Sequence, residues 1–185
     1  MCSIPWERRK QQLRYFRIYA DDRNPQPRFL NWYTKIRPGI PDRQVYEELF
    51  RKNHFQVELN GEIPFMDIIC HPCFMVSKEF AALIRLYSPE VRFKYAALSD
   101  KDNKRTAYYQ IPDLPVLDCL DVRSKLSRDK SEIITGILKE EKIQMCPIFR
   151  LGEVKGRYIV GDLKFVESVY RREVTGMRIE EFMVE

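Results

Sequence analysis

The last third of the chain constrains the fold more than any other stretch. Residues 148–182 (IFRLGEVKGRYIVGDLKFVESVYRREVTGMRIEEF) predict strand, turn, strand, helix, tight turn and strand, in that order. Asp162 is expected to cap the helix, and the glycines are expected to serve turns: Gly152, Gly156, Gly161 and Gly176. This unit predicts architecture and contains no recognisable catalytic set.

An upstream stretch, residues 74–93, echoes this unit at an offset that drifts from 84 to 86 residues. Phe74-Met75-Val76 matches Tyr158-Ile159-Val160, and the caps Ser77 and Asp162 each stand three residues before a phenylalanine. Two interpretations remain open: an internally duplicated α+β unit, or two unrelated strand–helix–strand units of a common type.

The rest of the chain predicts further strands and helices. Strands are expected at 15–19 and 55–59, a short helix at 43–52 behind an Asp42 cap, and hairpins at 92–111 and 133–145. Phe80, Leu83, Ile84 and Tyr87 form one apolar helix face. The predicted fold is therefore a single α+β domain over residues 1–185, with a mostly antiparallel sheet, hairpins, and two or more helices packed on it.

Charge divides the chain into a basic N-terminal segment, residues 1–40, and a main body, residues 41–185. Residues 1–37 carry nine Lys or Arg against three acids, a net charge of +6, whereas the remainder is −1. Arg14, Arg17, Trp32 and Tyr33 interleave cations with rings, which suits an acidic partner or nucleic acid. No RNP, KH or helix-turn-helix signature accompanies them, and a solvated strand and helix face explains the same residues.

Composition also predicts the compartment. No apolar run of about 18 residues predicts a membrane span, and the first residues, MCSIPWERRKQQ, lack the apolar core of a secretory signal. We therefore expect a cytoplasmic protein. The five cysteines are an odd number without a small-scaffold spacing, which predicts reduced thiols (Cys2, Cys70, Cys73, Cys119 and Cys146).

The motif Cys70-His71-Pro72-Cys73 has three interpretations. A redox site requires the CxxC motif to open a helix, but Phe74–Val76 intervenes before the Ser77 cap. A zinc site would use Cys70, Cys73 and His71 or His54, completed by Cys119 or Cys146, since no second CxxC pair exists. The third interpretation, buried residues in a proline-containing turn, requires no chemistry.

Other catalytic arrangements are not indicated. His54 and His71 are the only histidines, and no GxSxG, GxGxxG or GxxxxGK[ST] motif is present. Asp113, Asp118 and Asp121 could act as paired carboxylates, as charged loop residues, or as acidic groups presented to a basic partner.

Three segments taken together resemble a known family. They are PFMDIIC…FMVSKEFAALI, the hairpin and acidic segment RFKYAALSDKDNKRTAYYQIPDLPVLDCLD, and IFRL…YIVGDLKFVESVYRREVTGMRIEEF. Residues 60–182 resemble bacterial immunity proteins of polymorphic toxin systems, typified by a Myxococcus immunity-like domain of uncharacterised biochemical activity. The N-terminal segment and the CHPC motif lie outside this resemblance.

The resemblance implies a non-enzymatic protein that binds and occludes a cognate toxin in the bacterial cytoplasm. It brings no catalytic residue, cofactor or membrane contact with it. The partner-binding surface is expected either at the basic and aromatic front, with Arg14, Arg17, Trp32 and Tyr33, or at the acidic loop, with Asp118 and Asp121. The alternatives are a thiol or zinc protein using Cys70, His71 and Cys73, and nucleic-acid binding through the basic segment.

Overall fold

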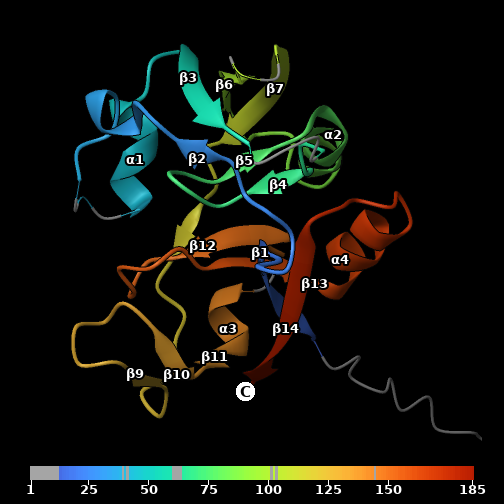
Figure 1. Ribbon diagram of the computed structural model, residues 1–185. Coiled ribbons are helices and arrows are strands. Elements are labelled where there is room, and N and C mark those ends of the chain that lie inside the picture. The colour runs from blue at the N-terminus through green and yellow to red at the C-terminus, as the bar shows by residue number, and fades with distance from the viewer. Residues whose placement is uncertain are drawn as a thin grey trace, which may run out of the picture.

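The structure is a computed structural model that describes residues 13–38, 40, 42–59, 64–100, 102, 104–143 and 145–185. Two six-stranded sheets form its upper and lower halves in Figure 1. The first part of the basic segment, with Trp6 and Arg8–Lys10, lies outside the described residues, as does Cys2.

The first sheet is the upper one in Figure 1 and has the strand order β2-β3-β6-β7-β5-β4. Its strands are β2 (Arg28–Phe29), β3 (Lys52–Glu58), β4 (Ile68–Ile69), β5 (Met75–Val76), β6 (Phe93–Asp100) and β7 (Arg105–Pro112). The helices beside it are η1 (Trp32–Thr34), α1 (Asp42–Glu48) and α2 (Lys78–Tyr87). The pair β3–β6 is parallel and the others are antiparallel.

The second sheet has the order β11-β14-β1-β13-β12-β8. Its strands are β1 (Tyr15–Ala20), β8 (Val116–Leu117), β11 (Ile137–Leu138), β12 (Ile148–Leu151), β13 (Ile159–Asp162) and β14 (Met177–Val184). Its helices are α3 (Glu140–Ile143) and α4 (Leu163–Tyr170), while β9 (Lys125–Leu126) and β10 (Ile133–Thr135) form a separate pair. The pairs β11–β14 and β8–β12 are parallel.

The two sheets share one scheme over five strands. The order β3-β6-β7-β5-β4 corresponds to β11-β14-β1-β13-β12, with the same succession of parallel and antiparallel pairs. The units β5–α2–β6 and β13–α4–β14, which the sequence echo singled out, occupy equivalent places. The difference is the central strand: β7 follows β6 directly, whereas β1 comes from the opposite end of the chain.

The two echoed helices begin in the way that the sequence predicts. The Ser77 hydroxyl accepts a hydrogen bond from the Phe80 amide at 3.2 Å, and the Asp162 carboxylate accepts one from the Phe165 amide at 2.7 Å. Each side chain thereby satisfies an amide that lacks a helical partner. The cap predicted at Asp42 lies outside the described side chains.

One core cluster lies between the sheets and takes residues from both. Phe80 of α2 and Phe165 of α4 are fully buried and meet with ring centroids 5.7 Å apart, edge to face. Burying a phenylalanine side chain contributes about 1.5–3 kcal/mol. The helices are also joined where the Tyr87 and Ser168 hydroxyls hydrogen bond at 2.6 Å. Two further clusters lie on the outer faces, one under α1 and one around α3.

The α+β class is confirmed, and antiparallel pairs outnumber parallel ones, but the sheets are mixed rather than purely antiparallel. The parallel pair β3–β6 arises because a long connection through β4, β5 and α2 returns the chain in its original direction. Among the described residues, no helix combines the length and apolar composition that crossing a bilayer requires.

Three local predictions are corrected. The hairpin expected at 133–145 is absent, because Glu140–Ile143 form α3 and β11 pairs with β14 instead. Gly161 lies inside β13 rather than in a turn; a Cβ there would stand 2.9 Å from the Ile18 side chain. The helix α1 ends at Glu48, because the Asn53 side chain binds the amide and carbonyl of Phe50 and leads the chain into β3.

Candidate functional site

One face of the first sheet is left partly uncovered because its helix is shorter than its strands. The helix α2 has 10 residues and rises about 15 Å, whereas β6 and β7 have 8 residues each and extend about 26 Å. Arg85 of α2 lies 4.0 Å from the Phe93 ring centroid, at one end of these strands. The other end of the same face is therefore open to solvent.

Eight side chains on the three adjacent strands share this uncovered face, which we call the open face. Strand register places them opposite one another: Lys52, His54 and Gln56 on β3; Tyr95, Ala97 and Ser99 on β6; Thr106 and Tyr108 on β7. The Tyr108 side chain is 78% exposed and that of Tyr95 is 43% exposed. Tyrosine combines a large apolar body with a polar tip and is enriched at protein interfaces.

Hydrogen bonds fix the polar centre of the open face. The His54 Nε2 and Ser99 Oγ atoms are 2.8 Å apart, and the Ser99 and Thr106 hydroxyls are 3.5 Å apart. A serine hydrolase would also need a carboxylate that orients the histidine. Within the described part of the chain, no carboxylate is hydrogen bonded to His54. Among the described residues, this row therefore holds a His–Ser pair without the third member of a serine-hydrolase triad.

Strand β2 borders the open face and carries an ion pair. The Arg28 guanidinium donates to the Glu58 carboxylate at 3.0 Å; the Arg28 side chain is exposed and that of Glu58 is half-buried. Leu30, which follows β2, is 42% exposed, and Phe50, just before β3, is 72% exposed. Apolar groups thus stand beside charged ones at the rim.

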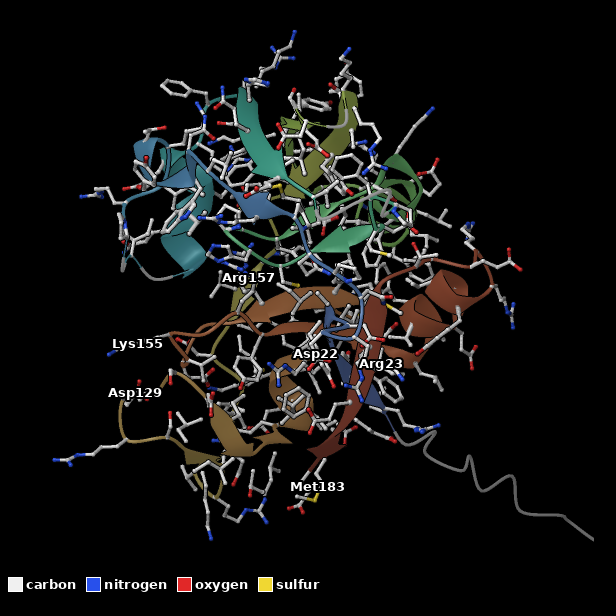
Figure 2. All side chains as sticks on the ribbon, viewed as in Figure 1. Asp22, Arg23, Asp129, Lys155, Arg157 and Met183 are labelled. Carbon is white, nitrogen blue, oxygen red and sulfur yellow. The ribbon has the colours of Figure 1, made fainter. Side chains whose placement is uncertain are left out.

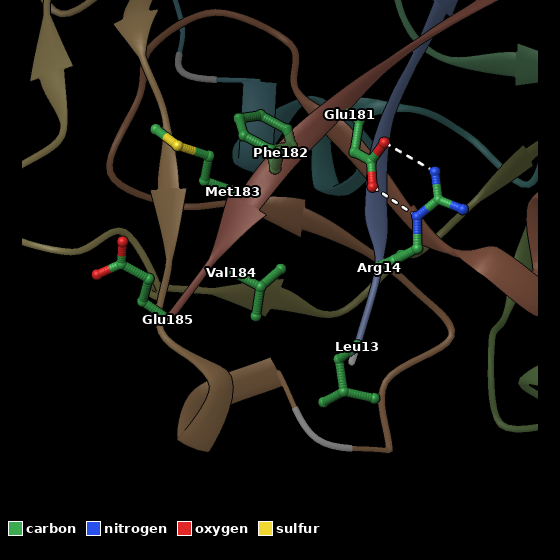
Figure 3. Close-up of a pocket in the computed structure, with 7 residues that line it drawn as sticks. All are labelled: Leu13, Arg14, Glu181, Phe182, Met183, Val184 and Glu185. Atoms are coloured by element: carbon green, nitrogen blue, oxygen red, sulfur yellow. Dashed lines mark hydrogen bonds and ion pairs between the residues drawn. The ribbon is translucent and has the colours of Figure 1, made fainter. Parts of the chain in front are cut away.

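Of the residues predicted to bind a partner, Arg17 lies on β1 of the second sheet and Arg14 immediately precedes that strand. Figure 3 shows the Arg14 guanidinium donating two hydrogen bonds to Glu181, at 2.6 and 2.8 Å, beside a hollow of about 550 Å³. Arg17 lies between the Tyr19 and Tyr158 rings, at 4.7 and 4.1 Å from their centroids. Both cations therefore already have contacts within the sheet.

Trp32 and Tyr33 lie on η1, and the structure brings Trp32 together with His71. The two ring centroids are 5.4 Å apart, edge to face. The His71 residue is exposed overall, but partial burial of its ring and the nearby charge of Arg157 lower the pKa of the imidazole below its ordinary value. The rings border a groove of about 250 Å³, which is lined by Trp32, Ile36, Arg37, Ile40, Val45, His71, Pro72, Lys155, Gly156 and Arg157.

The cysteines occupy packed positions. Cys73 is 2% exposed in the cluster under α1, and Cys70 packs against the core between the sheets. Burial raises the pKa of Cys119 to about 12 and that of Cys146 to about 11, which keeps both thiols protonated at neutral pH. The described residues contain no group of three or more His, Cys, Asp or Glu side chains placed to hold a metal ion.

The acidic residues of the predicted loop are dispersed. Asp121 accepts hydrogen bonds from the Arg123 side chain and backbone at 2.7 and 3.0 Å, which lowers the pKa of its carboxyl. The Asp118 carboxylate lies over Gly152, where a Cβ would stand 2.2 Å from it. Asp113 pairs with Arg92. These acids do not gather into one catalytic pair.

Comparison with known proteins finds no matching protein-family model and no match among curated proteins. The candidate site therefore depends on geometry. Sequence reasoning selected Trp32 and His71 separately and missed the open face. The alternating residues of the predicted hairpin at 92–111 place Phe93, Tyr95 and Ala97 on one side of a strand, but they give no sign that a helix covers only the first of them.

Proposed function

We propose that this chain is a non-enzymatic protein-binding protein that neutralises a cognate bacterial toxin by occlusion in the cytoplasm. The observation that carries the proposal is the open face, which presents Tyr95 and Tyr108 on a rigid sheet. Binding hot spots favour large aromatic side chains on pre-organised surfaces. The resemblance of residues 60–182 to immunity proteins supports the same function.

We further propose that the two sheets are copies of one duplicated unit. The shared strand scheme and the equivalent caps at Ser77 and Asp162 support this origin. In the second sheet the position equivalent to the open face carries the Arg14–Glu181 ion pair and the 52% exposed Met183. The equivalent ends of the two sheets are thus aromatic in one copy and charged in the other, and docking is assigned to the aromatic copy.

The test is co-expression with the product of the neighbouring reading frame in the source genome. We expect that protein to arrest growth of a bacterial host, the present chain to restore growth, and the two chains to form a stable complex in size-exclusion chromatography. Tyr108→Asp should weaken the complex at least tenfold, because it places a charge at the centre of the contact.

A matched control is Tyr170→Asp, which makes the same change at a 53% exposed tyrosine of α4, away from the open face. It should protect the host as the natural chain does. A neighbouring product that is harmless, or protection without any complex, would contradict toxin neutralisation by occlusion. An equal loss of complex formation in Tyr108→Asp and Tyr170→Asp would show that the open face is not the docking surface.

A further inference from the structure

Strand β14 is paired along the whole of one edge but along only part of the other. On one side, β1 pairs with Met177–Phe182; on the other, β11 pairs with Met183 and Val184 alone. Figure 2 shows Met183 at the lower end of β14, and β11 lies beside that end in Figure 1. Among the described residues, no strand pairs with the β11 side of Met177–Phe182. This stretch is an edge to which another strand can be added.

Hydrogen bonds at the two ends of β14 show which backbone groups point toward this edge. The Gly176 carbonyl oxygen accepts a bond from the Asp21 amide at 2.9 Å, on the β1 side. Glu185 uses both its amide and its carbonyl for bonds on the β11 side. Because the direction alternates along a strand, even-numbered residues of β14 point toward β1 and odd-numbered residues point away from it.

The amides and carbonyls of Met177, Ile179 and Glu181 therefore face the unpaired edge. Within the part of the chain that the structure describes, no backbone hydrogen bond joins them to another residue. In the first sheet the position equivalent to Ile179 is Tyr95, whose amide donates to the Arg51 carbonyl oxygen at 2.9 Å, where β3 begins. The second sheet thus lacks a strand at a place that the first sheet fills with β3.

The sequence of β14 complements itself in one antiparallel register. About a two-fold axis at Ile179, Met177 pairs with Glu181 of a second copy, and all the outward amides and carbonyls find partners. Arg178 then stands opposite Glu180 of the second copy in a non-hydrogen-bonded pair, in which side chains approach most closely. Moving the axis to Arg178 or to Glu180 would bring like charges together.

Both charged side chains are accessible to a second copy. The Glu180 side chain is 65% exposed and that of Arg178 is 43% exposed. Each has an ion pair within the chain, Glu180 with Arg17 at 3.7 Å and Arg178 with Asp22 at 3.3 Å, but such exposed pairs contribute little. Charges that protect a strand edge repel a second copy, whereas Arg178 and Glu180 attract each other across the axis.

We propose that this chain forms a two-fold symmetric dimer in which the β14 strands of two copies pair antiparallel about Ile179. The second sheets of the two copies then become one continuous sheet. A second copy fits this edge because its hydrogen-bonding groups and its charges are both self-complementary. The contact is a single strand pair, so the dimer is in reversible equilibrium with the monomer. This inference goes beyond the proposed function and does not depend on it, since it uses the second sheet and not the open face.

Analytical ultracentrifugation of the full chain over a wide range of protein concentrations measures this equilibrium. Arg178→Glu and Glu180→Arg should each raise the dimer dissociation constant at least fivefold, because each places like charges opposite one another at two symmetric positions. The double variant R178E/E180R restores opposite charges and should return the constant to within about twofold of the natural value. The control Lys125→Glu, at an exposed lysine of β9, should change it less than twofold.

The backbone contribution is tested at Glu181, whose amide points toward the unpaired edge. Glu181→Pro removes this amide and keeps the bonds to β1, since proline is tolerated where the N–H of a strand faces outward. Glu181→Ala is the matched control, because it loses the same ion pair with Arg14 and keeps the amide. The proline variant should dimerise at least fivefold more weakly than the alanine variant, with a native circular dichroism spectrum in both.

Hydrogen exchange followed by NMR tests the register. As protein concentration rises, the amides of Met177, Ile179 and Glu181 should become protected, whereas those of Arg178 and Glu180, which already face β1, should keep the same protection.

Several results would each overturn the inference. They are a monomer at every concentration, a double charge variant as weak as the single ones, a proline variant that dimerises as well as the alanine variant, and protection that does not change at the odd-numbered amides. A dimer that Tyr108→Asp dissociates and Arg178→Glu does not would place the contact on the open face and would also overturn it. A monomeric chain that still protects the host would leave the proposed function standing.

Discussion

At Asp162, one carboxylate is subject to two opposing effects. It caps α4 through the Phe165 amide, which favours the charged form, while burial disfavours that form and raises the pKa of the carboxyl above its ordinary value of 3.8. Ser77 caps α2 through its uncharged hydroxyl. The cap at α4 is therefore the one whose strength depends on pH.

We predict that Asp162→Ala lowers the free energy of unfolding by about 0.5–2 kcal/mol at neutral pH, because the cap is lost. Asp162→Asn keeps an acceptor and has no charge to desolvate. A pKa raised in the native state means that the contribution of Asp162 to stability is highest below pH 3.8 and falls as pH rises through the native pKa. The stability of Asp162→Asn relative to that of the wild type should therefore increase as pH rises from about 4 to 7.

Urea unfolding of the three proteins at several pH values in this range measures both effects. Parallel pH profiles for the wild type and Asp162→Asn would show that burial of the carboxylate has no cost. An alanine variant as stable as the wild type would show that the cap contributes nothing.

His71 provides a second pH-dependent contribution, of the opposite sign. Its lowered pKa means that the native state holds the neutral ring, so this stability is complete above pH 6.5 and is lost as pH falls through that value. We predict that the wild-type melting temperature falls more between about pH 7.5 and 5.5 than that of His71→Gln. A flat wild-type profile, or one that runs parallel to that of His71→Gln, would refute the prediction.

At the scale of elements, one loop contact joins the two halves. The Asp67 carboxylate, just before β4, accepts hydrogen bonds from the Thr175 amide and hydroxyl, both at 2.7 Å, in the turn before β14. Next to it, Gly176 has φ of +75° and lies against Met66, where a Cβ would stand 2.6 Å from the Met66 Cβ. A glycine is required here, both for the left-handed backbone and for the close approach.

We predict that Asp67→Ala lowers the free energy of unfolding by about 1–2 kcal/mol, since two hydrogen bonds to a charged acceptor are lost at a partly exposed site. Thr175→Val removes the hydroxyl bond alone and should cost about half as much. Urea unfolding of the two single variants and the double variant gives the coupling between them. Additive losses would mean that the two side chains do not interact.

Local signals predicted the elements well. Ser77 and Asp162 were identified as caps because a capping side chain acts only three residues along the chain, and the apolar spacing of Phe80 and Ile84 marked the buried face of α2. Gly161 was misassigned because its role depends on Ile18 and Phe165, which approach it only after β1 and α4 have packed on β13. The residues next to Gly161 in the sequence do not indicate that Ile18 and Phe165 will pack against it.

The site was harder to predict than the elements. Trp32 and His71 are 39 positions apart in the sequence, and their contact depends on how η1 meets the β4–β5 turn. The open face follows from a difference in length between α2 and the strands β6 and β7. What the sequence lacked was the strand order that places β3 beside β6 and so widens that face.

At the scale of the whole molecule, the unusual feature is the origin of β1. It pairs antiparallel with both β13 and β14 and fills the place that β7 fills in the first sheet, yet it begins the described chain. Without β1, the strands β13 and β14 would each present an unpaired edge in the middle of the sheet, and Phe16 and Ile18 would leave the central core. Closure of the second sheet therefore joins the two ends of the described chain.

This arrangement predicts that the chain tolerates one particular circular permutation. Tyr15 pairs with Phe182, so the end of β14 lies beside the start of β1, and a short hairpin turn can connect these two antiparallel strands. A permutant that begins at Arg23 and carries residues 13–22 after Glu185 should fold with the native circular dichroism spectrum. Its melting temperature should lie within about 5 °C of that of the natural chain, since every native strand pair is kept.

The matched control is the chain from Arg23 to Glu185 with residues 13–22 removed, which lacks β1 altogether. We expect it to unfold or aggregate, because the central strand of the second sheet and two core side chains are missing. If both proteins are native and equally stable, β1 is not needed for stability, although it fills the place that β7 fills in the first sheet. If both fail, closure depends on the native order of the chain and not only on the strand pairs.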